Sequence, residues 1–182
     1  NASEGNHMHA NGISMELYGK GYVLAPDAGI GLYLYSGLDY LEYYSQFPSH
    51  NTVCVDGISS YPVMKSNHSF DLKSSFPVSS EPGKTFTSVT YSDVSFREPE
   101  SRADQTRMMS IVTTGPETGY YVDIFRSRKE RGGDKMHDYF YHNLGQTLTL
   151  TGTDGADLNL QPTEELAFAG AHPVSYTHLR AH

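Results

Sequence analysis

Hydrophobic and polar residues alternate with a period of two along much of the chain. Ile13, Met15 and Leu17 alternate with polar or small residues, a Gly-Lys-Gly segment then interrupts the pattern, and residues 22–25 resume it. A period of two places successive side chains on opposite faces of a strand, and a glycine-rich break between two such runs is typical of a turn. Residues 13–25 are therefore predicted to form a β-hairpin.

The same alternation continues toward the C-terminus. It predicts strands at residues 53–55, 84–96, 105–114, 119–127, 137–142 and 147–151. Turn signals rich in glycine, proline and aspartate separate many of these runs. Short strands at such spacing predict an all-β protein, built as an antiparallel β-sandwich. The best helix signal is weak and lies at 38–46, where Pro48 ends it.

Composition limits the classes of partner. The 182 residues include 21 acidic and 13 basic ones, which gives a net charge of −8. This balance argues against nucleic acid and anionic membranes as partners, and no apolar stretch is long enough to span a membrane. An acidic polysaccharide would need a local basic cluster. One candidate, which fits a solvated loop equally well, consists of Arg126, Arg128, Lys129, Arg131 and Lys135.

Four side chains that can bind a metal lie in the first 50 residues. His7 and His9 form a His-x-His pair, Asp27 follows the predicted hairpin, and His50 precedes the strand at 53–55. Residues i and i+2 of a strand point to one side, so such a pair can present both imidazoles to one ion. Nitrogen and carboxylate donors are typical zinc ligands. Ordinary hydrogen-bonded histidines would give the same pattern, and the residues alone leave both interpretations open.

Several longer sequence words point to a known family. They are NHMH at 6–9, the predicted hairpin, HNTVCVDG at 50–57 and GGDKMHDYFYHNLGQ at 132–146. In this order they resemble the C-terminal β-domain of the heparinase II/III-like polysaccharide lyases, from about residue 4 to about residue 160. The resemblance implies a lyase that cleaves a uronate-containing acidic polysaccharide by β-elimination, without indicating which polymer.

The resemblance also implies what surrounds this domain. In the family, an N-terminal α/α-toroid carries the catalytic tyrosine, so we expect such a domain in the same chain and no activity from these residues alone. Periplasmic or secreted localisation is expected. Residues 1–172 are expected to form the domain, because residues 173–182 (PVSYTHLRAH) resemble a translated sequencing adapter.

Residue roles follow from the matching positions. Asn6 and His7 fall where the family places its substrate-facing pair. The zinc ligands fall at His9, Asp27 and His50, and the zinc is expected to be structural. A tyrosine in the stretch between the last two ligands acts as an acid in some relatives, and Tyr44 is the candidate here.

Other interpretations remain open at this stage. His68 is an alternative third zinc ligand. His137 and His142 lie on opposite faces of a predicted strand, and ordinary hydrogen bonding explains them better than a second metal site. A non-catalytic carbohydrate-binding or structural sandwich is the competing function, although the absence of tryptophan disfavours a dedicated binding domain. The single Cys54 excludes an internal disulfide and is expected to be buried.

Overall fold

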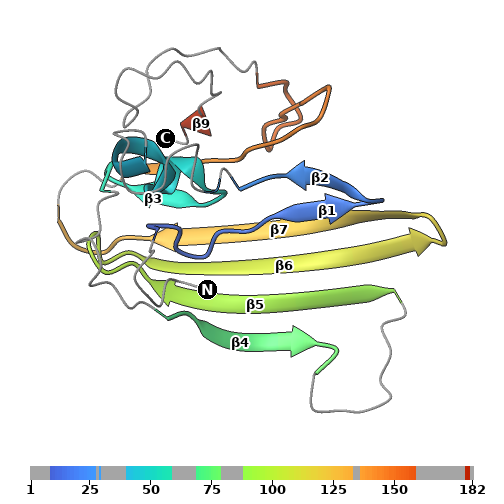
Figure 1. The fold of residues 1–182 in the computed structure, drawn as a ribbon, viewed down its shortest axis with the longest axis horizontal. Helices are drawn as coiled ribbons and strands as arrows, with labels where there is room; N and C mark the ends of the chain where they lie inside the picture. The colour runs from blue at the N-terminus through green and yellow to red at the C-terminus, as the bar shows by residue number, and fades with distance from the viewer. Residues whose placement is uncertain are drawn as a thin grey trace.

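A four-stranded antiparallel sheet forms the largest part of the structure (Figure 1). The computed structural model describes residues 9–27, 29, 40–58, 69–78, 88–132, 136–158 and 179–180. The sheet contains β4 (Asp71–Phe76), β5 (Val89–Arg97), β6 (Asp104–Gly115) and β7 (Thr118–Arg128), hydrogen-bonded in chain order. It is a meander, in which each strand pairs with the next along the chain.

Two smaller sheets accompany this one. The hairpin of β1 (Leu17–Gly19) and β2 (Tyr22–Ala25) confirms the hairpin predicted at 13–25. In the other sheet, β8 (His137–Tyr139) lies between β3 (Val53–Val55) and β9 (Leu179–Arg180). All pairings are antiparallel. The predicted all-β antiparallel fold class is therefore confirmed. The short β9 lies within residues 173–182, the predicted artefactual tail.

Helical structure is confined to single turns in the described residues. The weak helix predicted at 38–46 is a π-helical turn at Tyr40–Tyr44, and residues 38 and 39 lie outside the described part. A 3₁₀ turn follows at Phe47–Ser49, with Pro48 in its first turn, where a missing backbone N–H costs nothing. No described helix is long and apolar enough to cross a membrane.

The core lies on one face of the large sheet. Cross-strand pairing places Phe96 opposite Gln105, and Arg107 opposite Phe125, so these four side chains share a face. Phe96 packs against Ile13 from the N-terminal segment. Phe125 also packs against the cluster formed by Val53, Val55 and Ala103, with Tyr139 beside it. The β3–β8 pair and the segment before β1 thus form the second layer of the predicted sandwich.

A charged side chain occupies the centre of this interface. Arg107 is 2% exposed and makes a bidentate ion pair with Asp123, at 2.9 and 2.7 Å. Its remaining terminal nitrogen donates to the carbonyl oxygens of Ile13 at 2.9 Å and Asn51 at 2.6 Å. Tyr139 donates its hydroxyl to the same Asp123 carboxylate at 2.7 Å. A buried charge is tolerated only when paired and hydrogen-bonded, as this one is.

Two strand predictions need correction, and one observed strand was not predicted. The alternation at 147–151 was expected to form a strand and does not: only an isolated bridge between Thr151 and Asp157 forms there. The strand predicted at 137–142 ends at Tyr139. β4 was not predicted at all, because it is an edge strand whose residues are mostly exposed and therefore carry no hydrophobic alternation. The other predicted strands correspond to β3, β5, β6 and β7, and residues 84–87 of the strand predicted at 84–96 lie outside the described residues.

Candidate functional site

The site begins with a buried polar tripeptide. His50, Asn51 and Thr52 are each at most 1% exposed, although their side chains are all polar. The 3₁₀ turn before them places them in the core, and Ser49 closes that turn by donating its hydroxyl to the carbonyl oxygen of Gln46 at 2.9 Å. Burial of polar groups requires hydrogen-bond partners, and these partners define the site.

Asn51 joins three separate segments of the chain. Its side-chain nitrogen donates to the carbonyl oxygens of Met15 and Pro26, both at 3.0 Å. Its side-chain oxygen accepts the backbone N–H of His142 at 2.6 Å. Its backbone N–H donates to the Ser14 hydroxyl at 3.1 Å. One amide side chain therefore positions the segments that precede β1, follow β2 and follow β8.

His50 and Asp27 form a close pair inside this frame. The His50 Nδ1 lies 2.6 Å from the Asp27 Oδ2, and their side chains are 2% and 20% exposed. Burial alone would raise the pKa of Asp27, but the hydrogen bond and charge of His50 and the N–H of Gly29 hold this pKa below its ordinary value. The other ring nitrogen of His50 is buried without a hydrogen-bond partner. Such a nitrogen is available to a ligand.

His9 completes the predicted trio. Its ring centroid lies 5.3 Å from that of His50 and 5.5 Å from that of Tyr40. Burial and repulsion by His50 lower the pKa of His9 below its usual value, against an attraction by Asp27. The neutral imidazole that results is the form that binds metals. The structure thus brings His9, Asp27 and His50 together, whereas Asn6, His7 and His68 lie outside the described residues.

The donor chemistry of this cluster suits zinc, but its present geometry is that of a hydrogen-bonded pair. Two donors on a tetrahedral zinc ion lie roughly 3.3 Å apart, given bond lengths of about 2.0–2.2 Å. His50 and Asp27 are closer, at 2.6 Å, and would have to separate to take an ion between them. Among the described residues, no three His, Cys, Asp or Glu side chains are arranged to hold a metal ion. Zinc binding stays a prediction.

The predicted acid, Tyr44, lies in the π-helical turn. Its ring contacts the ring of Tyr43 edge to face at 5.2 Å. Tyr43 is itself buried, and its hydroxyl lies 3.4 Å from the Nε2 of His142. Nothing in the described contacts assigns a catalytic role to Tyr44, which stays a prediction.

His142 is a member of the site that the sequence did not indicate. Its Nδ1 lies 3.2 Å from the Asn51 side-chain oxygen. Burial and repulsion by His50 lower its pKa, opposed by Asp27 and the carbonyl of Pro48. The description of His142 as a hydrogen-bonded histidine is therefore correct, but its partners belong to the candidate site. His137 lies elsewhere, with its Nδ1 2.8 Å from the Ser127 hydroxyl.

Comparison with known proteins identifies the family. Residues 1–91 match the family described as "Heparinase II/III-like, C-terminal". The chain belongs to this heparinase II/III-like family. It is also 31% identical over 166 residues to an endo-acting ulvan lyase of Formosa agariphila, an alignment that covers 86% of this chain. No solved structure matches the chain significantly.

The extent of these matches bears on the site. The family match includes His9, Asp27 and His50 and ends within β5, so the heparinase II/III-like segment contains the whole predicted trio. Arg107 and His142, which hold the Asn51 backbone and side chain, come from residues after the matched segment. The chain spans about a fifth of the length of the ulvan lyase that it matches.

Proposed function

We propose that this heparinase II/III-like domain is part of an enzyme that cleaves a uronate polysaccharide by β-elimination. The observation that carries the proposal is the assembly of the buried His50 with the partly buried His9 and Asp27 within the family-matched segment. The identity to an endo-acting ulvan lyase makes ulvan the first polymer to test. A charged polysaccharide does not cross membranes unaided, so we also propose a periplasmic or secreted location for the enzyme.

The chemistry requires three contributions. The proton at C5 is next to a carboxylate, and hydrogen-bond donors must neutralise this carboxylate before the proton becomes acidic enough to remove. A base then takes the proton, and an acid protonates O4 as the C4–O4 bond breaks, which leaves a C4=C5 double bond. We assign the neutralising donors to Asn6 and His7 and the acid to Tyr44. The base belongs to the toroid domain that we expect elsewhere in the full protein.

The cluster of His9, Asp27 and His50 has a positioning role in this scheme. His9, Asp27 and His50 would hold a structural zinc ion, whose chemistry there is to cross-link side chains. His9 is two residues from His7, so fixing one imidazole limits where the other can point. Asn51 and His142 hold the backbone around the cluster, independently of any ion.

Product analysis tests the reaction. The full-length enzyme should convert ulvan into oligosaccharides that absorb ultraviolet light, because each β-elimination creates a double bond conjugated with the carboxylate. The isolated domain should produce none, since its base is missing. Shorter oligosaccharides without the new absorbance would show hydrolysis and contradict the proposal.

Paired variants test the division of roles. In the full-length enzyme, His7→Ala should abolish turnover and leave thermal stability and zinc content nearly unchanged, because only transition-state contacts are lost. His9→Ala should lose zinc and stability first, since metal binding is coupled to folding. Elemental analysis and thermal melting on both variants measure this. Loss of zinc from His7→Ala would move His7 into the metal site.

A further inference from the structure

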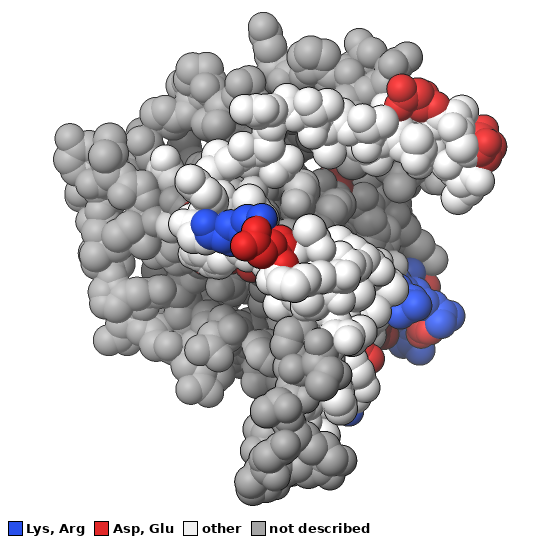
Figure 2. All heavy atoms as spheres, turned by 90° about the vertical axis from the view of Figure 1, so that its right-hand side faces the viewer, with Lys and Arg blue, Asp and Glu red and all other residues white. Residues whose placement is uncertain are grey.

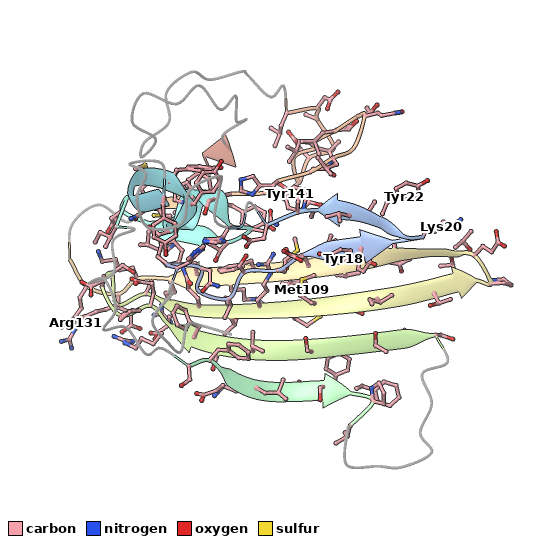
Figure 3. All side chains as sticks on the ribbon, in the orientation of Figure 1. Tyr18, Lys20, Tyr22, Met109, Arg131 and Tyr141 are labelled. Carbon is pink, nitrogen blue, oxygen red and sulfur yellow. The ribbon has the colours of Figure 1, made fainter. Side chains whose placement is uncertain are left out.

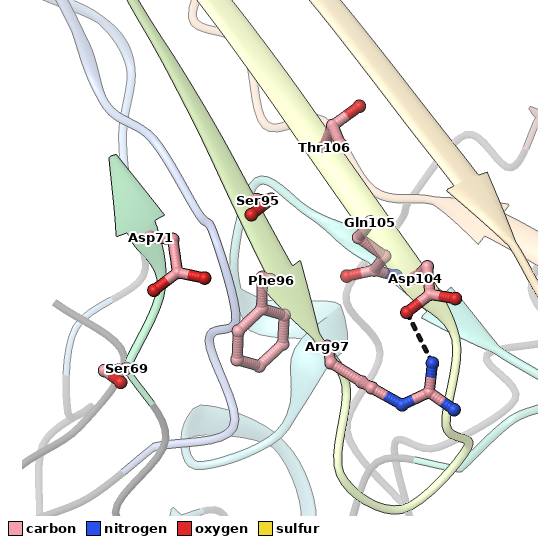
Figure 4. A pocket seen from close by; sticks show the side chains of 8 residues that line it. All are labelled: Ser69, Asp71, Ser95, Phe96, Arg97, Asp104, Gln105 and Thr106. Atoms are coloured by element: carbon pink, nitrogen blue, oxygen red, sulfur yellow. Dashed lines mark hydrogen bonds and ion pairs between the residues drawn. The ribbon is translucent and has the colours of Figure 1, made fainter. Parts of the chain in front are cut away.

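Two adjoining hollows lie at the end of the large sheet, where β5 turns into β6. The first has a volume of about 520 Å³ and is drawn in Figure 4. The second has a volume of about 340 Å³. Arg97 and Asp104 line both, so the two hollows meet at this pair. None of the histidines of the candidate site lines either hollow.

The second hollow is rich in arginine. It is lined by Arg97, Ser101, Arg102, Asp104, Glu130 and Arg131. Both carboxylates have partners: Asp104 binds Arg97 at 2.5 Å, and Glu130 binds Arg128 at 3.1 Å. Within the described residues, Arg102 and Arg131 pair with no carboxylate. Their guanidinium groups are therefore available to an anion, which such groups can bind through two parallel hydrogen bonds.

The turn that carries Arg102 is held from within. Glu98 is 1% exposed, and its carboxylate accepts the backbone N–H groups of Glu100, at 3.0 Å, and Ser101. Its own N–H donates to the carbonyl oxygen of Ala103 at 2.9 Å. Arg102 lies at φ +59°, which is uncommon for a residue with a side chain. The backbone beneath Arg102 is thus fixed before any ligand binds, and this lowers the entropy lost on binding.

The first hollow has a different lining, suited to hydroxyl groups. Besides the shared pair it is lined by Ser69, Asp71, Ser95, Phe96, Gln105 and Thr106. Hydroxyl side chains both donate and accept, and carboxylates accept from sugar hydroxyls. Figure 4 shows Asp71 and Ser95 on neighbouring strands, with the Phe96 ring between Asp71 and the Arg97–Asp104 pair. That exposed ion pair contributes little stability, so a ligand can replace it at small cost.

We propose that the double hollow binds a stretch of acidic oligosaccharide. An acidic group of one sugar unit is held by Arg102 and Arg131, and hydroxyl groups of the next unit face Ser95 and Thr106. The choice of ligand rests on the proposed function, because a β-eliminating lyase acts on a uronate polymer. This surface would hold the polymer on the domain separately from the histidine cluster.

Charge elsewhere provides a matched control. In the described part of the face drawn in Figure 2, the basic side chains lie next to acidic ones, and further acidic side chains lie apart at the upper right. Lys20, at the tip of the β1–β2 hairpin, and Arg131 lie at opposite ends of the molecule in Figure 3. Lys20→Gln therefore removes a positive charge without touching the hollows.

The test measures binding of ulvan oligosaccharides to the 182-residue chain by isothermal titration calorimetry. Arg102→Gln/Arg131→Gln should weaken binding about tenfold or more, since it removes charge-assisted hydrogen bonds to the acidic group. Lys20→Gln should change it less than about twofold, as a screened, distant charge does. Thermal melting checks that the variants fold. If the double variant does not fold, the single Arg131→Gln variant replaces it, and this variant should weaken binding less.

The outcomes test the double hollow and the lyase proposal separately. Equal affinity of the double variant and the unmodified chain overturns the double hollow as a binding site, as does equal binding of a neutral oligosaccharide of the same length. Neither result affects the lyase proposal, which depends on ultraviolet-absorbing products of the full-length enzyme. In that enzyme the double variant should raise KM and leave kcat unchanged; a lower kcat with unchanged KM contradicts a binding role.

Discussion

Asn51 should be the most costly side chain to remove from the candidate site. Asn51→Ala deletes the donor to the carbonyl oxygens of Met15 and Pro26 and the acceptor for His142, all in a fully buried position. Leaving a buried polar group unsatisfied costs about 1–3 kcal/mol. Because three such groups lose their partner and some of them regain one by rearrangement, we expect a loss of about 3–5 kcal/mol in the free energy of unfolding.

The neighbouring residue supplies the control. Thr52 is also fully buried, but its hydroxyl has no hydrogen-bond partner. Replacing an unsatisfied hydroxyl by a methyl group of similar shape removes a desolvation penalty, so Thr52→Val should be neutral or stabilising by up to about 1 kcal/mol. The two variants differ by one position and have opposite expected signs, which separates hydrogen bonding from burial as the cause.

Urea unfolding followed by far-ultraviolet circular dichroism measures both changes. The unfolding midpoint should fall for Asn51→Ala and stay level or rise for Thr52→Val, with unchanged slope. A total stability of about 5–15 kcal/mol is usual for a domain, so the measurement on Asn51→Ala is best made at low temperature. The reasoning is refuted if Asn51→Ala costs less than about 1 kcal/mol, or if Thr52→Val costs as much as Asn51→Ala.

Three further predictions concern buried or partly buried side chains around the site. Asp123→Ala should destabilise the chain by about 3–5 kcal/mol in urea unfolding, because it leaves Arg107 as a buried unpaired charge; a change below about 1 kcal/mol would contradict this. Hydrogen bonds from Lys129 and from the backbone N–H of Met136 lower the pKa of Asp56, although burial alone would raise it. The contribution of Asp56 to the free energy of unfolding is therefore fully present above the ordinary carboxyl pKa, and it is lost as the pH falls through the lowered pKa. Asp56→Asn should flatten that acid limb of the stability curve. Burial raises the pKa of Cys54 to about 12, so a thiol reagent at mildly alkaline pH should modify only unfolded chains.

The alternation in the sequence predicted the strands that bury one face, and it failed for strands whose residues are mostly exposed. β6 lies inside the sheet, between β5 and β7, and its alternation gave bounds close to the observed ones. β4 escaped prediction because edge residues such as Leu72 are largely exposed, so the pattern carries no information there. At 147–151 the alternation was present but no described strand pairs with it, and pairing is a tertiary property.

The site shows the same limit. His9, Asp27 and His50 could be named as a group because they belong to short recognisable words. Asn51 and His142 could not be linked, since 91 positions separate them and a polar residue beside an apolar strand is usually exposed. A signal was present in HNT itself: three polar residues directly before the buried strand VCV indicate polar groups held in a core.

The hydrogen bonds that hold the site join residues far apart in the sequence, and this separation determines when the site can assemble during folding. Arg107 bonds a carbonyl 94 positions earlier, and the backbone of His142 bonds the Asn51 side chain 91 positions earlier. Contacts between distant positions slow folding, because a long loop must close before they contribute. During synthesis, residues 9–51 leave the ribosome well before the groups that hold them. His9, Asp27 and His50 should therefore stay exposed and unassembled until β6 and the segment after β8 have emerged. Stalling before residue 107 would yield a chain that contains all three side chains of the predicted trio but no assembled site.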